Sequence, residues 1–448
     1  MRYDAAIIGA GANGLAAAAT LAAAGYKVVV LERMETCGGR CTTREFHPGF
    51  RASPFCDEIA PIPPAIFRAL DLARRGAIFP PAAPSRFRAR ISEALARAFA
   101  DAALTPQPRW FGAASESVAW PGQEFSRLSL FDALDGLGGT ETMAESLSGR
   151  AADPSLNGSA LHLLTPGSGG SGAVMGGLAT LARALERAAR EAGAEILLGL
   201  EAADIRHHKQ RATGVRLADG TEIEARAVIS TLDLRRTFFS LFAWKDLPKA
   251  AIERVSQFRH AAASARLLLA LDTPPAMDAP VHAPGSTDAI AAWRSGTLPE
   301  RPPMTVRLVS AGDPSLAPIG QAVLTATLGC IPHHLFDGPW THEKRQALRE
   351  RALARIEALL PGTATHVLAS DLIVPPDIEE SLGVSEGDLD GGEVAPDQMF
   401  ALRGFEDHPG GRTPVAGLYL GGHSSPIGPF ASCAAGVAAA RAAMADFK

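Results

Sequence analysis

Three closely spaced glycines near the start of the sequence constrain the fold more than any other feature. Gly9, Gly11 and Gly14 come directly after an apolar segment at residues 5–8 and open an alanine-rich segment that runs to Gly25. This order predicts a strand, a tight turn and a helix that ends at Gly25. In such a unit the first glycine permits the turn, the second lets a pyrophosphate approach the backbone, and the third lets the helix pack closely on the strand.

A carboxylate at the end of the next apolar segment completes a β-α-β unit. The segment spans residues 27–31 and Glu32 follows it, close to the spacing of about 20 residues expected of a carboxylate that binds ribose hydroxyls. The N-terminus of the intervening helix would offer unpaired N–H groups to a pyrophosphate. Because Glu32 would repel a phosphate at the ribose 2′ position, the unit favours FAD or NAD over NADP. An ordinary buried β-α-β unit would need neither the glycine spacing nor the carboxylate.

A second glycine pair narrows the choice of dinucleotide. Gly38, Gly39 and Arg40 follow soon after the ribose carboxylate, where a unit that binds only NAD has no use for them. The sequence from Glu32-Arg33 to Gly39-Arg40 resembles a signature of flavoproteins of the amine oxidase and phytoene desaturase type. In that family the glycine pair and the arginine lie along FAD.

The composition is that of a large globular enzyme. The chain has 448 residues, is 47% hydrophobic and carries a formal net charge of −5, so it can bury the core of more than one lobe. No basic run stands out, which argues against nucleic acid as a partner. Five cysteines in so long a chain do not make a disulfide framework. Since neither a secretory signal nor a membrane-spanning apolar stretch is evident, we expect a cytoplasmic protein.

Two later regions resemble the same family. Residues 176–231 predict a helix, a strand, a hairpin at Asp219-Gly220 between strands at 213–217 and 221–225, and a buried strand at 226–231. In the family that it resembles, the strand at 227–231 returns beside the first one. Residues 417–447 predict a strand, a glycine pair, a proline-glycine loop and a helix. Because the three regions occur in the family's order, the chain is identified as a member of the phytoene desaturase-like FAD-dependent oxidoreductases of the flavin amine oxidase superfamily. It is most similar to the branch labelled "pyridine nucleotide-disulfide oxidoreductase domain-containing protein 2".

The resemblance implies a two-lobe α/β fold with non-covalent FAD. A Rossmann-like FAD-binding domain would comprise residues 1–75, 176–240 and 415–448, and a second, mixed-sheet substrate domain residues 76–175 and 241–414. Near the cofactor, Ala202 would meet the adenine, and Gly421 and Gly422 would approach the pyrophosphate and ribityl chain. Family members often read Gly-Ala-Gly-Thr-His-Pro-Gly near the end, whereas this chain has Gly422-His-Ser-Ser-Pro-Ile-Gly, so the loop over the flavin differs in detail.

The expected substrate lobe gives weaker signals. Strands are predicted at residues 265–271 and 323–328 and a long helix at 342–360. Its first part predicts helix at 86–103 and at 128–147, with a glycine-rich loop at 166–172.

Few side chains in the sequence point to catalysis. His423, beside the C-terminal flavin loop, is a candidate acid or base. Phe55, Cys56 and Phe430 are candidates for the substrate pocket, and Cys56 is better explained by packing than as a covalent flavin anchor. Cys37 and Cys41 bracket the glycine pair, but the FAD contacts expected between them argue against a redox disulfide.

No metal site is expected. The adjacent histidines at 207–208 and 333–334 lack nearby partners, and neighbouring side chains in a strand point to opposite faces.

The predicted reaction removes a hydride from a C–H (or C–N) bond of a small, organic, apolar substrate to form a double bond, with oxygen or a quinone as the final acceptor. One alternative is a flavin-dependent isomerase or saturase, and another is a flavin-binding scaffold with little turnover. An NAD-only dehydrogenase is a weaker alternative because it leaves the second glycine pair unexplained. Peripheral contact with a membrane and homo-oligomerisation both stay open.

Overall fold

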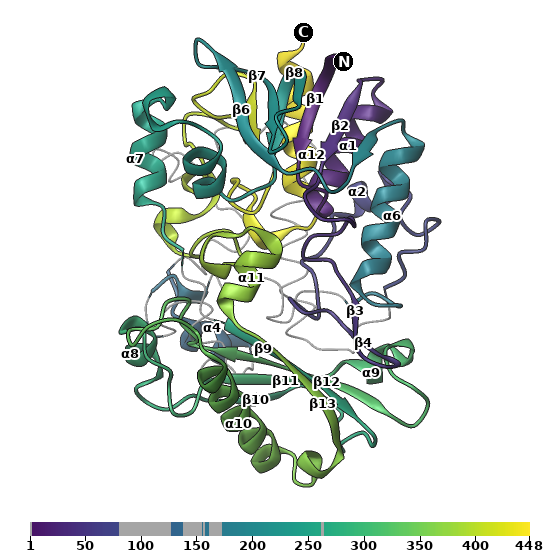
Figure 1. The fold of residues 1–448 in the computed structure, drawn as a ribbon, viewed down its shortest axis with the longest axis vertical. Coiled ribbons are helices and arrows are strands. Elements are labelled where there is room, and N and C mark those ends of the chain that lie inside the picture. The colour runs from purple at the N-terminus through teal and green to yellow at the C-terminus, as the bar shows by residue number, and fades with distance from the viewer. Residues whose placement is uncertain (1, 80–126, 138–154, 156, 161–172, 261–263) are drawn as a thin grey trace.

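The computed structural model describes residues 2–79, 127–137, 155, 157–160, 173–260 and 264–448. Two lobes lie along its long axis, each built around one large β-sheet, and both chain termini lie at the far end of the first lobe (Figure 1). The first lobe contains the N- and C-terminal strands, and the second contains strands from the middle of the chain. The two-lobe α/β architecture expected from the sequence is therefore confirmed.

The sheet of the first lobe has seven strands in the order β5-β2-β1-β8-β7-β6, and β14 also pairs with β8. Its strands are β1 (Arg2–Ile8), β2 (Val28–Leu31), β5 (Glu195–Leu197), β6 (Ala202–His208), β7 (Arg211–Leu217), β8 (Glu222–Ser230) and β14 (Leu418–Leu420). The pairings among β5, β2, β1, β8 and β14 are parallel, whereas β6 and β7 are antiparallel to their neighbours.

The return of the chain beside β1 is confirmed, because β8 pairs with β1 in parallel. The sequence predicted two separate strands at 221–225 and 226–231, and this was wrong: β8 is continuous. Along one edge β8 pairs with two strands, its first half with β7 and its second half with β14. One strand therefore joins the hairpin to the C-terminal motif.

Three helices cover one face of this sheet: α1 (Ala12–Ala23), α6 (Leu178–Glu191) and α12 (Ala434–Asp446). α1 packs against both of the others. α1 and α12 are rich in alanine, and a Cβ at Gly436 would lie 1.8 Å from the carbonyl oxygen of Asn13, so small residues allow the two helices to touch along their backbones. The opposite face of the sheet packs against Phe238, Phe242 and α7 (Lys249–Gln257).

The sheet of the second lobe has five strands in the order β10-β11-β12-β9-β13. They are β9 (Ser264–Leu271), β10 (Val281–Ala283), β11 (Met304–Leu308), β12 (Ala322–Gly329) and β13 (Val367–Ile373). Every pairing in this sheet is antiparallel, so the mixed pairing in the described chain lies in the first lobe. One face packs against α10 (His342–Leu359), and the other against β4 (Phe50–Ala52) and Leu316.

The strands predicted at 265–271 and 323–328 and the helix predicted at 342–360 are confirmed as β9, β12 and α10. Within the predicted helix at 128–147, α4 (Leu130–Leu137) is described. The helix predicted at 86–103 and the loop at 166–172 lie outside the described residues. Among the described helices, none combines the length and apolar character needed to cross a bilayer.

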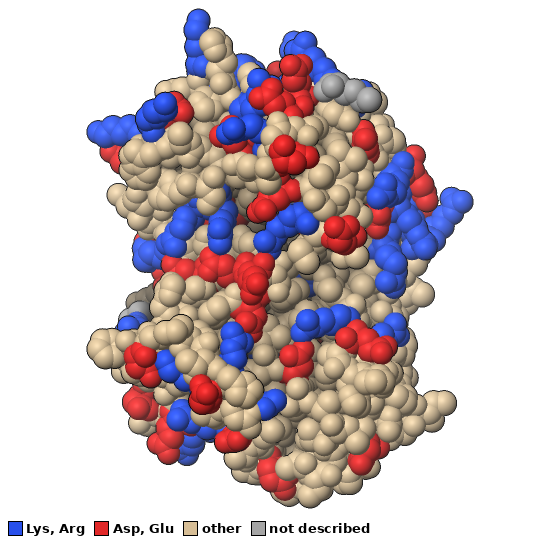
Figure 2. Space-filling view, in the orientation of Figure 1, with Lys and Arg blue, Asp and Glu red and all other residues tan. Residues whose placement is uncertain are grey.

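Charged side chains of both signs form a band between the lobes (Figure 2). Part of this band belongs to α11 (Pro375–Leu382), which lies at the front between the lobes (Figure 1). Arg236 donates to Glu379 of α11 at 2.6 Å, and Arg235 donates to Glu386 at 2.6 Å. The first ion pair links α11 to the first lobe, and the second links the segment that follows α11.

Candidate functional site

A cavity of about 620 Å³ lies at the carboxyl ends of β1 and β2. Its lining extends from the glycine-rich turn and Glu32 to Ala202 at the start of β6, then past α11 to His423 and Cys433. Ligands of open α/β sheets bind beyond the carboxyl ends of the strands. The cavity therefore has the position of a nucleotide site.

The three N-terminal glycines have different surroundings. Gly9 has a φ of +98°, and a Cβ there would lie 2.3 Å from Thr231 Oγ1. A Cβ at Gly14 would lie 2.0 Å from the carbonyl oxygen of Gly9, so this glycine is needed for α1 to start against β1. A Cβ at Gly11 would meet nothing nearer than Gly38 O at 4.0 Å and would point into space next to the cavity that Gly11 lines.

The second glycine pair lies directly beside the first motif. Gly38 N donates to Ala10 O at 2.9 Å, and Gly11 and Gly38 form a parallel bridge. Gly39 has a φ of +54°, and a Cβ there would approach the Cα of Gly11 to 3.3 Å. The two glycine motifs thus form one continuous wall of bare backbone along the cavity.

Glu32 is held at the cavity by two backbone groups. Its carboxylate accepts hydrogen bonds from Ala10 N at 2.7 Å and Met34 N at 2.9 Å, and the residue is only 8% exposed. An ionised carboxylate has about four lone-pair positions, so two such bonds leave capacity for ribose hydroxyls. Bare backbone beside Gly11 and a fixed carboxylate at this distance along the chain fit a dinucleotide such as FAD.

Arg33 and Arg40, which the sequence predicts to bind the cofactor, line the cavity, and both contact the segment at 380–390. Arg33 donates to the carbonyl of Glu380 in α11 at 2.6 Å. Arg40 donates to Leu389 O at 2.5 Å and lies 3.8 Å from a carboxylate oxygen of Asp390. Contact of the two guanidinium groups with the cofactor stays a prediction, but their position fixes the segments that close the cavity.

The C-terminal glycine pair has a packing reason for its lack of side chains. A Cβ at Gly421 would lie 2.8 Å from Ile229 Cγ2, and one at Gly422 would lie 2.3 Å from Thr231 O. Neither glycine is among the cavity-lining residues of the described chain, whereas Pro429 and Cys433 are. Their predicted approach to the pyrophosphate and ribityl chain therefore stays a prediction, and their packing role comes from the structure.

His423 lines the cavity as an uncharged imidazole. Its Nδ1 lies 3.0 Å from Leu389 O, which can only accept, and 3.5 Å from Arg40 Nη1, which can only donate, so the shorter contact favours the tautomer with the proton on Nδ1. Burial, together with the nearby Arg40 guanidinium, lowers the pKa of His423 to about 3. At neutral pH the ring has no second proton to give, and Nε2 remains as an acceptor. His423 is thus ill-suited as a general acid, and a role as base stays a prediction.

Sequence reasoning missed Arg403, which is fully buried next to this loop. Arg403 donates to His423 O and Asp390 O, both at 2.6 Å, and to Gly392 O at 3.0 Å. It therefore joins the loop after α11 to the loop after β14. The glycines of both loops mark turns in the sequence, but nothing there indicates which arginine the turns surround.

The cysteines and aromatic residues predicted near the site lie away from the cavities that the structure describes, apart from Cys41. Phe55 is in the core beneath β9, Phe430 is fully buried in the core of the first lobe, and Cys56 points its thiol at Arg40 O at 3.8 Å. Cys37 and Cys41 are free thiols, and burial is the main cause that raises the pKa of each to about 12. Neither is a thiolate at neutral pH, which argues against redox chemistry.

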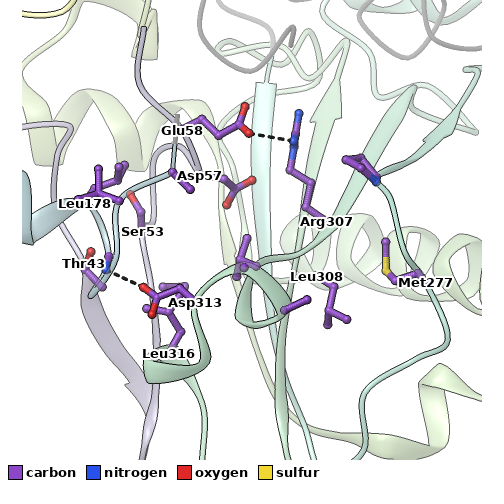
Figure 3. Close-up of a pocket in the computed structure, with 18 of the residues that line it drawn as sticks. Thr43, Ser53, Asp57, Glu58, Leu178, Met277, Arg307, Leu308, Asp313 and Leu316 are labelled. Atoms are coloured by element: carbon purple, nitrogen blue, oxygen red, sulfur yellow. Dashed lines mark hydrogen bonds and ion pairs between the residues drawn. The ribbon is translucent and has the colours of Figure 1, made fainter. Parts of the chain in front are cut away.

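A second cavity, of about 360 Å³, lies between the lobes; we call it the interlobe cavity (Figure 3). Thr43, Ser53 and Glu58 line it from the first part of the chain, and Arg307, Leu308 and Asp313 line it from the second lobe. Its buried charges form pairs across the two lobes: Glu58 lies 3.4 Å from Arg307, and Asp57 lies 2.5 Å from Arg266. Nothing in the sequence indicated these pairings.

Within the described residues, no group of three or more His, Cys, Asp or Glu side chains is placed to hold a metal ion.

Comparisons with known proteins agree with this geometry. A model of an NAD(P)-binding Rossmann-like domain matches residues 7–71, and the model of flavin containing amine oxidoreductases matches residues 114–383. The chain is 27% identical to mouse pyridine nucleotide-disulfide oxidoreductase domain-containing protein 2, over 100% of this chain and 94% of that protein. It is 30% identical to 4,4'-diaponeurosporene oxygenase of Staphylococcus haemolyticus, over 49% of this chain and 44% of that enzyme.

The fold is similar to that of a putrescine oxidase solved with putrescine, with a TM-score of 0.61, 16% identity, and coverage of 100% of this chain and 99% of that one. This likeness concerns the fold alone. The family model, by contrast, spans more than half of the chain. The chain therefore belongs to the flavin containing amine oxidoreductases and is an FAD-dependent oxidoreductase of the amine oxidase and desaturase type.

Proposed function

We propose that this enzyme removes a hydride and a proton from a small, largely apolar organic molecule bound in the interlobe cavity, and so forms a C=C or C=N double bond. When bound, FAD supplies the hydride acceptor and the route by which two electrons pass to oxygen or a quinone. The family membership supports flavin-dependent oxidation in general. The substrate bond and the final acceptor are parts of the proposal.

One observation carries the proposal: a single segment separates the two cavities. Ser53, Asp57 and Glu58 line the interlobe cavity, and the next residue, Ile59, lines the cofactor cavity. Ser432 N donates to Pro61 O at 3.1 Å, which places this segment against the C-terminal loop. A molecule in the interlobe cavity would therefore lie beside the end of the cofactor cavity where the family resemblance puts the flavin ring.

The N-terminus of α12 lies at this end of the cofactor cavity and would stabilise a reduced cofactor. Cys433 lines the cofactor cavity and caps α12, so the N-terminus of this helix faces the cavity. The partial positive charge of a helix N-terminus stabilises negative charge, such as that which develops when a cofactor is reduced. The chain's contribution here is electrostatic and needs no ionised side chain.

The remaining tasks of the chain are to position the substrate and to keep water away. Leu178, Met277, Leu308 and Leu316 give the interlobe cavity an apolar lining. Hydride transfer requires a C–H bond held in line with the acceptor in a dry site, and such positioning supplies much of the rate enhancement. Where a proton must also be removed, Nε2 of His423 is the candidate acceptor at the cofactor cavity, although a pKa lowered to about 3 makes it a weak base.

The first experiment is the visible spectrum of the purified protein before and after denaturation. Flavin that passes to the supernatant on denaturation would support non-covalent FAD, and flavin that stays with the protein would revive Cys56 as an anchor. The Gly11→Val variant tests the site directly, because a Cβ at this position would meet no described protein atom nearer than Gly38 O at 4.0 Å and would enter the space beside the cavity. Unchanged flavin content in that variant would contradict the assignment of Gly11 to the pyrophosphate.

The second experiment is anaerobic incubation with candidate substrates, followed by mass measurement of the product. Bleaching of the flavin with loss of two hydrogens from the substrate would support the proposal. An unchanged mass would indicate an isomerase, and a gain of two hydrogens from a pre-reduced enzyme would indicate a saturase. A flavin that no candidate reduces would favour a scaffold with little turnover.

A further inference from the structure

One wall of the cofactor cavity is a helix whose apolar side belongs to the second lobe. Residues 379–384, the last half of α11 and the turn after it, line the cavity. The fully buried Ile378 of α11 packs in an apolar cluster of the second lobe with Leu268 of β9 and Val323 of β12. α11 therefore covers a cavity at the edge of the first sheet while it is packed on the second (Figure 1).

Polar contacts join this wall to the first lobe. Arg236 donates to the carboxylate of Glu379 at 2.6 Å, and Arg33 donates to the carbonyl oxygen of Glu380 at 2.6 Å. All four residues line the cofactor cavity. The last carbonyls of a helix carry partial negative charge, so both arginines bind negative charge on α11.

Glu379 connects the two lobes at the cofactor cavity. One of its carboxylate oxygens accepts from Arg236 of the first lobe, and the other lies 2.5 Å from Nε2 of His333, in the loop after β12. The side chains of Arg236, Glu379 and His333 are 37%, 26% and 12% exposed, so water and salt screen their contacts only in part. A single carboxylate therefore ties α11 to an element of each lobe.

The segment after α11 has a separate anchor. The buried carboxylate of Asp233 accepts from the backbone N–H of Ser385 at 2.7 Å and from its hydroxyl at 3.0 Å. Because this anchor does not involve Glu379, loss of the Glu379 contacts should loosen α11 without unfolding the chain.

Of the cavity walls, α11 should be the easiest to move. The strands β1 and β2 on the other side are buried among the helices of the first lobe, and close-packed cores resist displacement. The contacts of Glu379 are polar and partly exposed, so water can replace them.

We propose that Glu379 is a positioning residue that retains FAD. While its carboxylate holds Arg236 and His333, α11 stays against the bound cofactor and slows its release. When these contacts break, α11 can move with the second lobe and open the cavity. This inference concerns the cofactor and is independent of the substrate proposed above.

The test uses the full chain loaded with FAD, and it measures the rate at which FAD leaves the protein. After dilution, the flavin that remains with the protein is measured on desalted samples at successive times. Glu379→Gln keeps the size of the side chain and should release FAD about three- to tenfold faster, because two partly exposed charged contacts are lost. Arg236→Gln removes one of them and should release FAD about two- to fivefold faster.

Salt supplies a readout that a merely structural role would not change. Raising salt from about 0.05 M to about 0.5 M screens partly exposed ion pairs, so release from wild type should accelerate, and it should accelerate at least about twofold less in Glu379→Gln. The double variant Glu379→Gln with Arg236→Gln should release FAD at the rate of Glu379→Gln, because both substitutions remove the same pair.

Glu380→Gln is the matched control. Glu380 lies in the same wall and carries the same charge, but its side chain is exposed, and within the described residues its carboxylate has no hydrogen bond or ion pair. Its substitution therefore removes one negative charge without breaking a contact, and release should stay within about twofold of wild type. Melting temperatures of the FAD-free variants should lie within about 2 °C of wild type.

FAD release from Glu379→Gln at or below the wild-type rate would overturn the inference. An equal acceleration in Glu380→Gln would also overturn it, because the effect would then belong to charge alone. If Glu379→Gln melts at a much lower temperature, Arg236→Gln decides: unchanged release there would mean that Glu379 only stabilises the fold. None of these measurements needs a substrate, so failure of the proposed function would leave this inference standing, and the converse also holds.

Discussion

The cofactor cavity and the interlobe cavity lie on either side of one segment, residues 53–59, but their walls are of different kinds. The first is bounded by bare backbone, with Gly11 beside Gly38. The second is bounded by side chains from distant parts of the sequence, such as Asp57 and Arg266. Backbone shape is encoded locally by the absence of side chains, whereas a charge pair becomes visible only when the chain has folded.

The largest expected effect is that of Gly14→Ala. The new Cβ would lie 2.0 Å from the carbonyl oxygen of Gly9, and neither α1 nor β1 can move without opening the core. We expect a loss of about 5 kcal/mol or more in unfolding free energy, beyond the usual range of overpacking effects, because the clash is with backbone that cannot give way. Soluble yield and melting temperature measure it. Gly11→Ala is the matched control and should fold normally but bind FAD more weakly.

If both glycine variants lose stability equally, the cofactor cavity would depend on packing at each glycine rather than on space for a ligand at one of them. If both keep their stability and lose FAD, the packing role assigned to Gly14 would be wrong. Only the pattern in which Gly14→Ala unfolds and Gly11→Ala loses cofactor supports a packing role for Gly14 and a ligand-binding role for Gly11.

In the interlobe cavity, Asp57→Asn tests the side-chain wall. The substitution leaves the Arg266 charge buried and without its carboxylate, which costs about 3–5 kcal/mol in comparable cases. Melting temperature measured with FAD bound should fall, while flavin content should change little. The double variant Asp57→Leu with Arg266→Met removes both charges and should recover much of the loss. A double variant less stable than Asp57→Asn would show that the pair itself, rather than its charge balance, holds the lobes together.

The difference between the two cavity walls also explains which features could be predicted from the sequence. The turn at Gly9 and Gly11, the carboxylate of Glu32 and the second glycine pair were predicted together, and in the structure they line one cavity, because each acts through local backbone geometry. Signals of the same kind predicted β9, β12 and α10 in the second lobe.

The sequence could not show which residues far apart in the chain come into contact. Arg403 gave no signal because its acceptors are backbone carbonyls, which every residue has. Phe430, predicted for the substrate pocket from its place in a flavin-loop motif, is instead a core residue, since a motif fixes the path of the backbone and not the direction of each side chain.

A smaller effect is expected in the pH dependence of stability, and one histidine in each lobe tests it. Burial lowers the pKa of His423 to about 3 and that of His282, in the second lobe, to about 4, with Arg40 and Arg307 contributing respectively. Below an unfolded-state pKa of about 6.5 the unfolded chain binds a proton that the folded chain does not, so stability falls as pH falls. Each residue should contribute about 1.4 kcal/mol per pH unit between about pH 6 and 5.

Unfolding measured at pH 7, 6 and 5 should therefore show a shallower pH dependence in His423→Asn and in His282→Asn than in wild type. Carboxylates titrate mainly below this range, so the slope between pH 6 and 5 is the informative quantity. A slope unchanged in His423→Asn would mean that His423 is protonated in the folded protein, and it would then regain its candidacy as a general acid.

The smallest effect should come from Arg44→Gln. Like Asp57–Arg266, the interaction that it removes is an ion pair between an arginine and an aspartate, but it is exposed to solvent. Arg44 of β3 (Arg44–His47) lies 2.5 Å from Asp371 of β13, with side chains that are 50% and 33% exposed. Exposed pairs contribute about 0–1 kcal/mol, because water and salt screen them. We expect a melting temperature within about 2 °C of wild type. A larger fall in melting temperature would mean that exposed ion pairs join the two lobes as strongly as the buried ion pairs of the interlobe cavity do.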